Sequence, residues 1–193
     1  MSEDKARGLM RSAWTKRRES FDASTGERQS ALAEARAELT AAVGLLREDG
    51  SRVSYAQAVH LLANVELDLG REDRAMALWN EAIDVLRGTD DILQLAHKVR
   101  HLGDLHFRTG RLDEAEAQYE EALAIYREHD GPGSLDFANA VARVAALQEK
   151  LGDKGRALSL WRETRDLYAA VDLPAGVEDA EAHIRRLAGT GGS

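Results

Sequence analysis

The chain has 193 residues and a formal net charge of −8, with no cysteine and only two prolines. The lack of cysteine excludes disulfides, iron–sulfur clusters and thiol catalysis, and the negative charge argues against non-specific binding to nucleic acid. No stretch approaches the roughly 18 apolar residues of a membrane-spanning helix, and the first residues lack the apolar core of a secretory signal. We therefore expect a cytoplasmic protein, and the abundance of Ala, Leu, Glu and Arg favours helix over sheet.

Helix-breaking residues divide the chain into stretches whose apolar residues recur about every 3.6 positions. Ser51, Ser134 and either Asp90 or Asp91 are expected N-caps, because their side-chain oxygens can accept hydrogen bonds from the free amides of a first helical turn. The tail 189–193 is expected to be disordered. The predicted helices span 5–22, 29–48, 52–69, 72–87, 91–109, 112–129, 134–151, 154–170 and 175–188.

A repeat is marked by three glycines, each followed by an alanine after five residues and by a large aromatic residue after nine. The glycines are spaced 40 and 42 residues apart, a period that is typical of stacked helical repeats. Each glycine is expected to end one helix in the left-handed conformation and to let the next helix fold back. The three sets are Gly70, Ala75 and Trp79; Gly110, Ala115 and Tyr119; and Gly152, Ala157 and Trp161.

The same register extends beyond the three glycines. Apolar residues of 29–48 lie 40 positions before their counterparts in 72–87, which indicates a degenerate first repeat over 5–48. At the other end, 174–188 matches only the first helix of a repeat. Its Glu181 replaces the valines of earlier repeats, as expected for a capping helix with no further neighbour. We predict a single domain over 1–188, with three clear repeats over 52–170.

The pattern of small residue, glycine, alanine and aromatic residue resembles the tetratricopeptide repeat. It stands here as Leu62-Ala63, Gly70, Ala75, Trp79 and Ala82, and recurs in the next two repeats. The units are longer than the usual family unit of about 34 residues, and they resemble those of kinesin light chains and of bacterial regulators with repeat arrays. The resemblance implies an all-α, right-handed superhelical solenoid of antiparallel helix hairpins, with about nine helices and four and a half repeats.

In this family the first helix of each hairpin lines a concave groove, and the resemblance therefore implies where a partner would bind. In the middle repeat, Arg100, Asp104 and Arg108 can pair with one another, which would leave only a solvated face, whereas Phe107 between them favours contact with a peptide. The candidate groove residues are Gln57, His60, Asn64, Leu67, His97, Arg100, Asp104, Phe107, Arg108, Asn139 and Arg143.

The histidines of these helices allow two interpretations. His97 and His101 are four residues apart on one helix, a spacing that can chelate a metal. No constellation of Asp, Glu or Cys completes a recognisable site, so we expect no metal and interpret both residues as hydrogen-bonding or exposed. Because histidine titrates near neutrality, a pH-sensitive groove is a further expectation.

The first predicted helix is locally basic and carries an apolar stripe. Met10, Trp14 and Phe21 are spaced at i, i+4 and i+11, so they share one side of a helix. We expect this stripe to pack on helix 29–48. The alternatives are a contact with a second copy of the chain and attachment to an acidic surface, including anionic lipid.

No catalytic motif is present: the chain has no phosphate-binding loop, dinucleotide turn, metalloprotease motif or nucleophile elbow. We predict a non-enzymatic scaffold without a cofactor that binds a protein or peptide in its groove, and not nucleic acid. The alternatives are a homo-oligomeric assembly module, for example a homodimer, and a domain that responds to a peptide or metabolite and acts on a separate effector.

Overall fold

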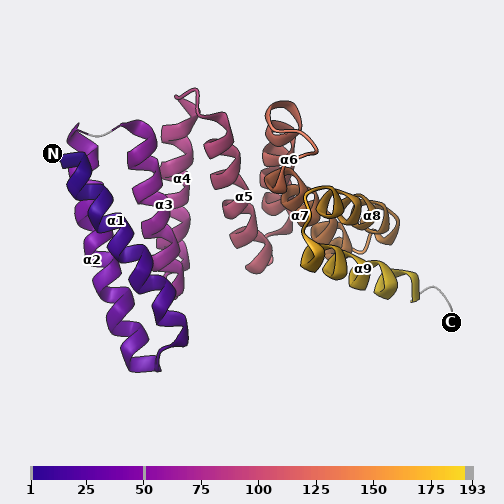
Figure 1. Cartoon of the computed structure of the whole chain (residues 1–193), viewed down its shortest axis with the longest axis horizontal. Coiled ribbons are helices and arrows are strands. Elements are labelled where there is room, and N and C mark those ends of the chain that lie inside the picture. The colour runs from indigo at the N-terminus through magenta and orange to yellow at the C-terminus, as the bar shows by residue number, and fades with distance from the viewer. Residues whose placement is uncertain (1, 50, 190–193) are drawn as a thin grey trace. The chain divides into compact units, whose positions relative to one another are not determined.

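The computed structural model describes residues 2–49 and 51–189, and all regular structure in these ranges is helical (Figure 1). The nine predicted helices are confirmed, although the first two begin at Ser2 and Thr25, three to four residues earlier than expected. The tail predicted over 189–193 was wrong at Gly189, which is the last residue of α9, and residues 190–193 lie outside the described residues. The elements are α1 (Ser2–Glu19), η1 (Ser20–Asp22), α2 (Thr25–Asp49), α3 (Arg52–Asp68), α4 (Glu72–Arg87), α5 (Ile92–Arg108), α6 (Leu112–His129), α7 (Leu135–Leu151), α8 (Lys154–Ala170) and α9 (Pro174–Gly189).

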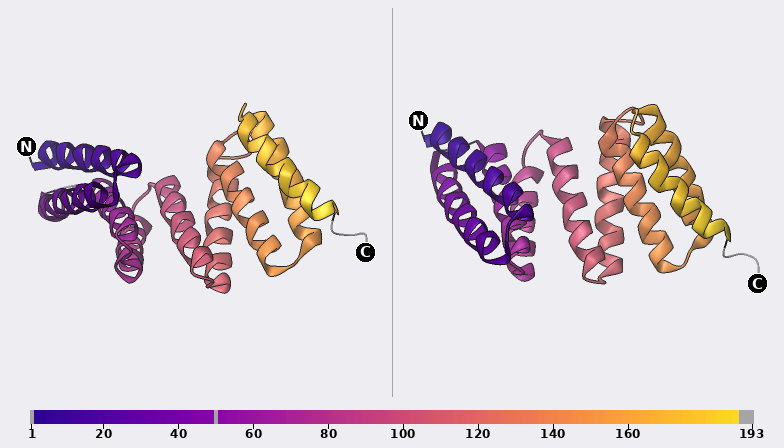
Figure 2. Two further views of the ribbon diagram at one scale, coloured as in Figure 1. Left: turned by 90° about the horizontal axis from the view of Figure 1, so that it is seen from below. Right: turned by 60° about the horizontal axis from the view of Figure 1, so that its bottom comes forward.

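The chain divides into two compact units, residues 1–91 and 92–193. In the first unit α1 packs on α2, α2 on α3 and α3 on α4. Figure 2 shows α1 and α2 running side by side as a long hairpin. In the second unit each helix from α5 to α9 packs on the next. A single continuous domain over 1–188 stays a prediction.

Local signals in the sequence set the ends of these helices. The Ser51 side chain accepts a hydrogen bond from the Ser54 amide, and Ser134 accepts from two amides at the start of α7, so both are N-caps as predicted. Gly152 ends α7 at a φ of 87°, where a side chain would be strained, and its amide bonds back to the last turn. Gly70 and Gly110 also have positive φ, as predicted.

Small residues let the paired helices approach closely. A Cβ added at Gly103 of α5 would lie 2.7 Å from the ring of Tyr119 on α6, so the glycine is required by the aromatic residue of its own repeat. Ala75, Ala115 and Ala157 are fully buried, and Trp79, Tyr119 and Trp161 are buried beside them. The core role predicted for the repeated alanines and aromatic residues is therefore confirmed.

The packing of α1 differs from the expectation. The helix is buried through Ala6 and Ala13, whereas the side chains of Trp14 and Phe21 are 47% and 51% exposed. The prediction that the stripe of Met10, Trp14 and Phe21 packs on the next helix was wrong for the two aromatic residues. Two alanines seven residues apart let α1 lie close against α2, and this contact turns the large apolar side chains outward.

Candidate functional site

Hydrogen bonds tie the predicted groove residues of α3 to the core. The indole Nε1 of Trp79 on α4 donates to Nδ1 of His60 at 3.1 Å, and the two rings lie 6.3 Å apart. Since Nδ1 accepts this bond, a neutral His60 carries its proton on Nε2, and the side-chain amide of Asn64 faces this N–H at 3.2 Å with its oxygen as the acceptor. His60 is buried. It therefore helps to hold α3 against α4, a role that the sequence did not reveal.

Asp104 is the centre of a polar cluster on α5. It accepts a hydrogen bond of 2.9 Å from the hydroxyl of Tyr119 on α6, and its Oδ1 lies 3.1 Å from Nε of Arg143 on α7. Arg100 and His101 approach its other oxygen at 3.7 Å and 3.6 Å. Burial and the neighbouring carboxylate raise the pKa of Tyr119, so this hydroxyl stays protonated as a donor. Asp104 thus links three helices of the second unit.

The two arginines of this cluster differ in their surroundings. Arg100 is buried beside Asp104, and its Nε has no partner among the residues that the structure describes. The side chain of Arg143 is 50% exposed and uses Nε for Asp104. Within the described part of the chain, no hydrogen bond occupies its two terminal nitrogens. Arg143 can therefore offer N–H donors to a partner while its position is fixed by Asp104.

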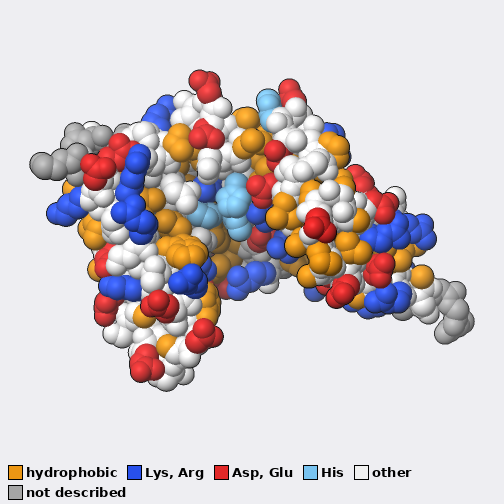
Figure 3. Space-filling view, in the orientation of Figure 1, with side chains coloured by type: hydrophobic (Ala, Val, Ile, Leu, Met, Phe, Trp, Pro, Cys, Tyr) orange, Lys and Arg blue, Asp and Glu red, His pale blue; other side chains and the backbone are white. Residues whose placement is uncertain are grey.

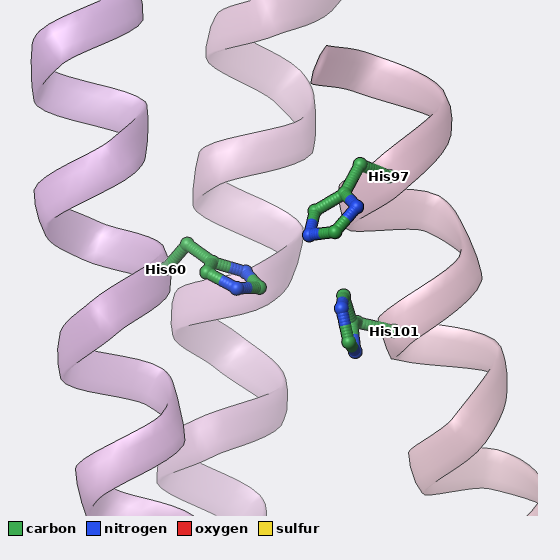
Figure 4. A group of neighbouring side chains, drawn as sticks. All are labelled: His60, His97 and His101. Atoms are coloured by element: carbon green, nitrogen blue, oxygen red, sulfur yellow. The ribbon is translucent and has the colours of Figure 1, made fainter. Parts of the chain in front are cut away.

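His97 and His101 project from one side of α5 (Figure 4), with their ring centres 4.6 Å apart in an edge-to-face arrangement. Burial, together with the positive charges of Lys98 and Arg100, lowers the pKa of His97 to about 4. Burial and Arg100 lower the pKa of His101 to about 2. Both rings are therefore neutral between pH 6 and 8. The expectation that these histidines make a groove that titrates near neutrality was wrong, because burial among cations disfavours the charged form.

The predicted residues of α7 lie next to this cluster. Asn139 accepts a hydrogen bond of 2.9 Å from the hydroxyl of Tyr168 on α8, and Arg143 follows one helical turn later. Because α5 and α7 are in contact, Asp104 and Phe107 of α5 and Asn139 and Arg143 of α7 form what we call the α5–α7 face. Phe107 is partly buried, and Arg108 is exposed at the end of α5.

A family model described as tetratricopeptide repeat matches residues 91–170, which include α5 to α8. These four helices are therefore of the tetratricopeptide-repeat type. A second model, described as anaphase-promoting complex subunit 5, matches residues 11–105. No curated protein matches the sequence.

Solved structures of tetratricopeptide-type proteins share the fold at low sequence identity. Aspartyl phosphate phosphatase F from Bacillus subtilis has a TM-score of 0.83 and 13% identity over 97% of this chain and 46% of its own. The TPR-like repeats of a putative kinesin light chain from Podosopora anserina have a TM-score of 0.69 and 15% identity, over 97% of this chain and 95% of their own. The apo quorum sensor NprR from B. thuringiensis has a TM-score of 0.68 and 16% identity, over 83% of this chain and 47% of its own. The chain thus spans about half the length of the first and last of these proteins.

The remaining predicted residues of this repeat protein lie on α3, in the first unit. Leu67 is partly buried near the end of the helix, and Gln57 lines a hollow between α1 and α3. The hollow was not predicted, although Met10 and Trp14 of the predicted apolar stripe are among the residues that line it. None of the helices in the described ranges is long and apolar enough to cross a membrane. The cytoplasmic location stays a prediction.

Proposed function

We propose that the chain is a non-enzymatic protein-interaction scaffold and that the α5–α7 face binds a peptide or a helix of a partner. The observation that carries the proposal is the pairing of Arg143 with Asp104, which holds a half-exposed guanidinium on this face. A guanidinium fixed through Nε keeps terminal N–H groups for carbonyl or carboxylate oxygens of a partner. The anchored Arg143 side chain then loses less conformational entropy on binding than an unanchored arginine would.

Neighbouring side chains complement this donor. Phe107 offers a partly buried aromatic surface, and Asn139 is held by Tyr168 so that its amide has a fixed orientation. Aromatic residues and arginines are enriched among the residues that contribute most to binding, and an oriented amide can pair with the main chain of an extended peptide. We propose that a partner contacts Asp104, Phe107, Asn139 and Arg143 together.

The relatives support a binding role without naming the partner. NprR is a quorum sensor and phosphatase F is named for aspartyl phosphate, so the same fold serves regulatory proteins. A regulator that acts on a separate effector and a homodimer both stay predictions for this chain. The absence of catalysis is likewise an expectation, which rests on the absence of catalytic motifs in the sequence.

A peptide library displayed on phage and selected on the immobilised full-length chain tests the proposal. Selected peptides should bind the wild type and Arg162→Glu, an exposed charge reversal on α8, with equal affinity. They should bind Arg143→Glu about tenfold more weakly or worse, as expected when a contacting arginine is replaced by an acidic residue. Equal binding to Arg143→Glu, or no enrichment of any peptide, would overturn the proposal. Circular dichroism and urea unfolding show whether both variants are folded.

A further inference from the structure

Two histidines of α5 lie close enough together to bind one metal ion. His97 and His101 are four residues apart, so both project from the same side of the helix (Figure 4). Their ring centres lie 4.6 Å apart, and a ring nitrogen of one residue lies within 4.8 Å of a ring nitrogen of the other. Two histidines at this spacing on one helix are a known pair of zinc ligands.

Only a small movement of the side chains is needed to bring both nitrogens onto one ion. Two imidazole nitrogens that bind zinc at about 2.0–2.1 Å in tetrahedral geometry lie about 3.4 Å apart. His97 and His101 are both partly exposed, so their rings can turn toward each other without a change in the backbone. Because both ligands come from one helix, no second element has to move to complete the pair.

A carboxylate beside the pair favours metal binding by His101. Oδ2 of Asp104 lies 3.6 Å from Nδ1 of His101. Histidines that bind metals commonly donate their other N–H to a carboxylate, which orients the ring and makes the ligand nitrogen more basic. With Nδ1 directed at Asp104, Nε2 of His101 is the ligand atom. We expected no metal from the sequence because no acidic residue completed a site, and Asp104 is a carboxylate that the sequence pattern did not place there.

The charges around the pair act in both directions. Burial and the positive charges of Lys98 and Arg100 lower the pKa of both rings, so at pH 7 the rings are in the neutral form that binds metals. The same two cations oppose the charge of a metal ion, whereas Asp104 and Asp136 act in the opposite direction. The site should therefore hold only ions with a strong preference for imidazole.

The charge of the whole chain adds a long-range term in favour of a cation. The net charge is −8, and Figure 3 shows acidic side chains over much of the face that it draws. A negative surface potential raises the local concentration of cations.

We propose that His97 and His101 of α5 bind a divalent transition-metal ion such as zinc or copper, with Asp104 as the hydrogen-bond acceptor of His101. Imidazole nitrogens suit these ions, whereas magnesium and calcium prefer oxygen ligands. Water molecules complete the coordination on the exposed side of the pair. Neither histidine belongs to the α5–α7 face as defined above, so this inference and the proposed peptide binding can fail separately.

Isothermal titration calorimetry of the untagged full-length chain at pH 7 tests this inference, with zinc, copper and magnesium chloride as the probes. One zinc or copper ion should bind per chain, copper more tightly than zinc, and magnesium should give no binding heat. His97→Ala and His101→Ala should each weaken zinc binding at least about tenfold, since loss of a group that merely orients a ligand already costs about 10–100-fold. His129→Ala on α6 removes an exposed histidine elsewhere and should bind zinc as the wild type does.

Three results would overturn the inference. The first is wild-type zinc affinity in His97→Ala and His101→Ala. The second is zinc binding no tighter than magnesium binding. The third is an equal loss in His129→Ala, because the ions would then be spread over surface histidines. Circular dichroism shows whether the variants keep their helical content, and copper should broaden the NMR signals of the His97 and His101 rings before those of other histidines.

Discussion

Trp79 and His60 are joined across the α3–α4 hairpin by a hydrogen bond of 3.1 Å from the indole to the imidazole. Tyr119 makes the corresponding link to Asp104 in the next repeat, and Trp161 bonds to Glu149 in the third. The large aromatic residue of each repeat thus has two roles: it fills the core, and its polar atom fixes a side chain on the first helix of the same hairpin.

Removing this link should destabilise the first unit. Trp79→Phe keeps an aromatic ring but deletes the indole N–H that donates to Nδ1 of the buried His60. We expect the free energy of unfolding to fall by about 1–3 kcal/mol, from the lost volume and the lost hydrogen bond. Urea unfolding followed by circular dichroism measures the change. An unchanged midpoint would show that the hydrogen bond and the packing of Trp79 contribute nothing to stability.

The close approach at Gly103 gives a second prediction. Gly103→Ala places a methyl group 2.7 Å from the Tyr119 ring and should destabilise the fold by about 1–3 kcal/mol, despite the higher helix propensity of alanine. Gly44→Ala in α2 is the matched control, because a Cβ there meets no atom within 4 Å. That change should stabilise the fold by up to about 1 kcal/mol. Thermal unfolding of both variants tests the contrast, and a stabilised Gly103→Ala would refute it.

The docking of α9 should depend on Glu149. This carboxylate of α7 bonds to Nε of Arg186 at 3.1 Å and lies 2.8 Å from Nδ1 of His183, whose ring stacks on Trp161 at 3.9 Å. Burial raises the pKa of Glu149, but the hydrogen bonds from Arg186 and His183 outweigh it and hold the pKa below its ordinary value. The contribution of Glu149 to stability is therefore present above the unfolded-state pKa and is lost as the pH falls through the lower, folded-state pKa.

Hydrogen exchange of the α9 amides measures this docking. Glu149→Gln should exchange faster in α9 than the wild type at pH 7, and the difference should disappear in acid once Glu149 is protonated. The control is Glu120→Gln, which breaks an exposed pair with Arg156 and should leave α9 protected. Equal protection of α9 in Glu149→Gln and wild type at pH 7 would mean that apolar packing alone holds the capping helix.

The histidines of α5 should keep one charge state near neutrality. Their lowered pKa values, about 4 for His97 and about 2 for His101, mean that the unfolded chain binds more protons than the folded chain below about pH 6.5. Stability should therefore fall as the pH decreases from about 6.5 toward the folded pKa values. The imidazole C2 protons in NMR spectra should not shift between pH 8 and 6. Titration of either ring with a midpoint near 6.5 would contradict the described environment.

Much of the fold followed from spacing alone. Gly70, Gly110 and Gly152 predicted the hairpin turns, and the spacing of Trp79, Tyr119 and Trp161 predicted that they lie in the core, because backbone conformation and volume constrain these positions locally. The side-chain links could not be predicted in the same way. Whether Trp79 reaches His60 and Tyr119 reaches Asp104 depends on the rotation of one helix against another, which the repeat pattern leaves open.

The first helix shows where the sequence pattern misled. A stripe of Met10, Trp14 and Phe21 looks like a core-facing side, yet Ala6 and Ala13 are the buried residues. A prediction from hydrophobic periodicity gives most weight to large apolar residues. Two helices that pack closely instead have small residues, such as alanine, at their contact. The burial of Arg100 and the low pKa values of His97 and His101 could not be predicted from the sequence either, because burial among cations depends on how the helices pack together.

The most direct test of the central claim is to map a selected peptide on the isotope-labelled full-length chain by NMR. If the α5–α7 face is the binding surface, the largest shift changes on titration should fall on Phe107, Asn139 and Arg143, and the side chain of Arg162 on α8 should be unaffected. If the largest changes instead fall on the second helices α6 and α8, with Asn139 and Arg143 unmoved, the α5–α7 face is not the binding surface and the proposed function is wrong.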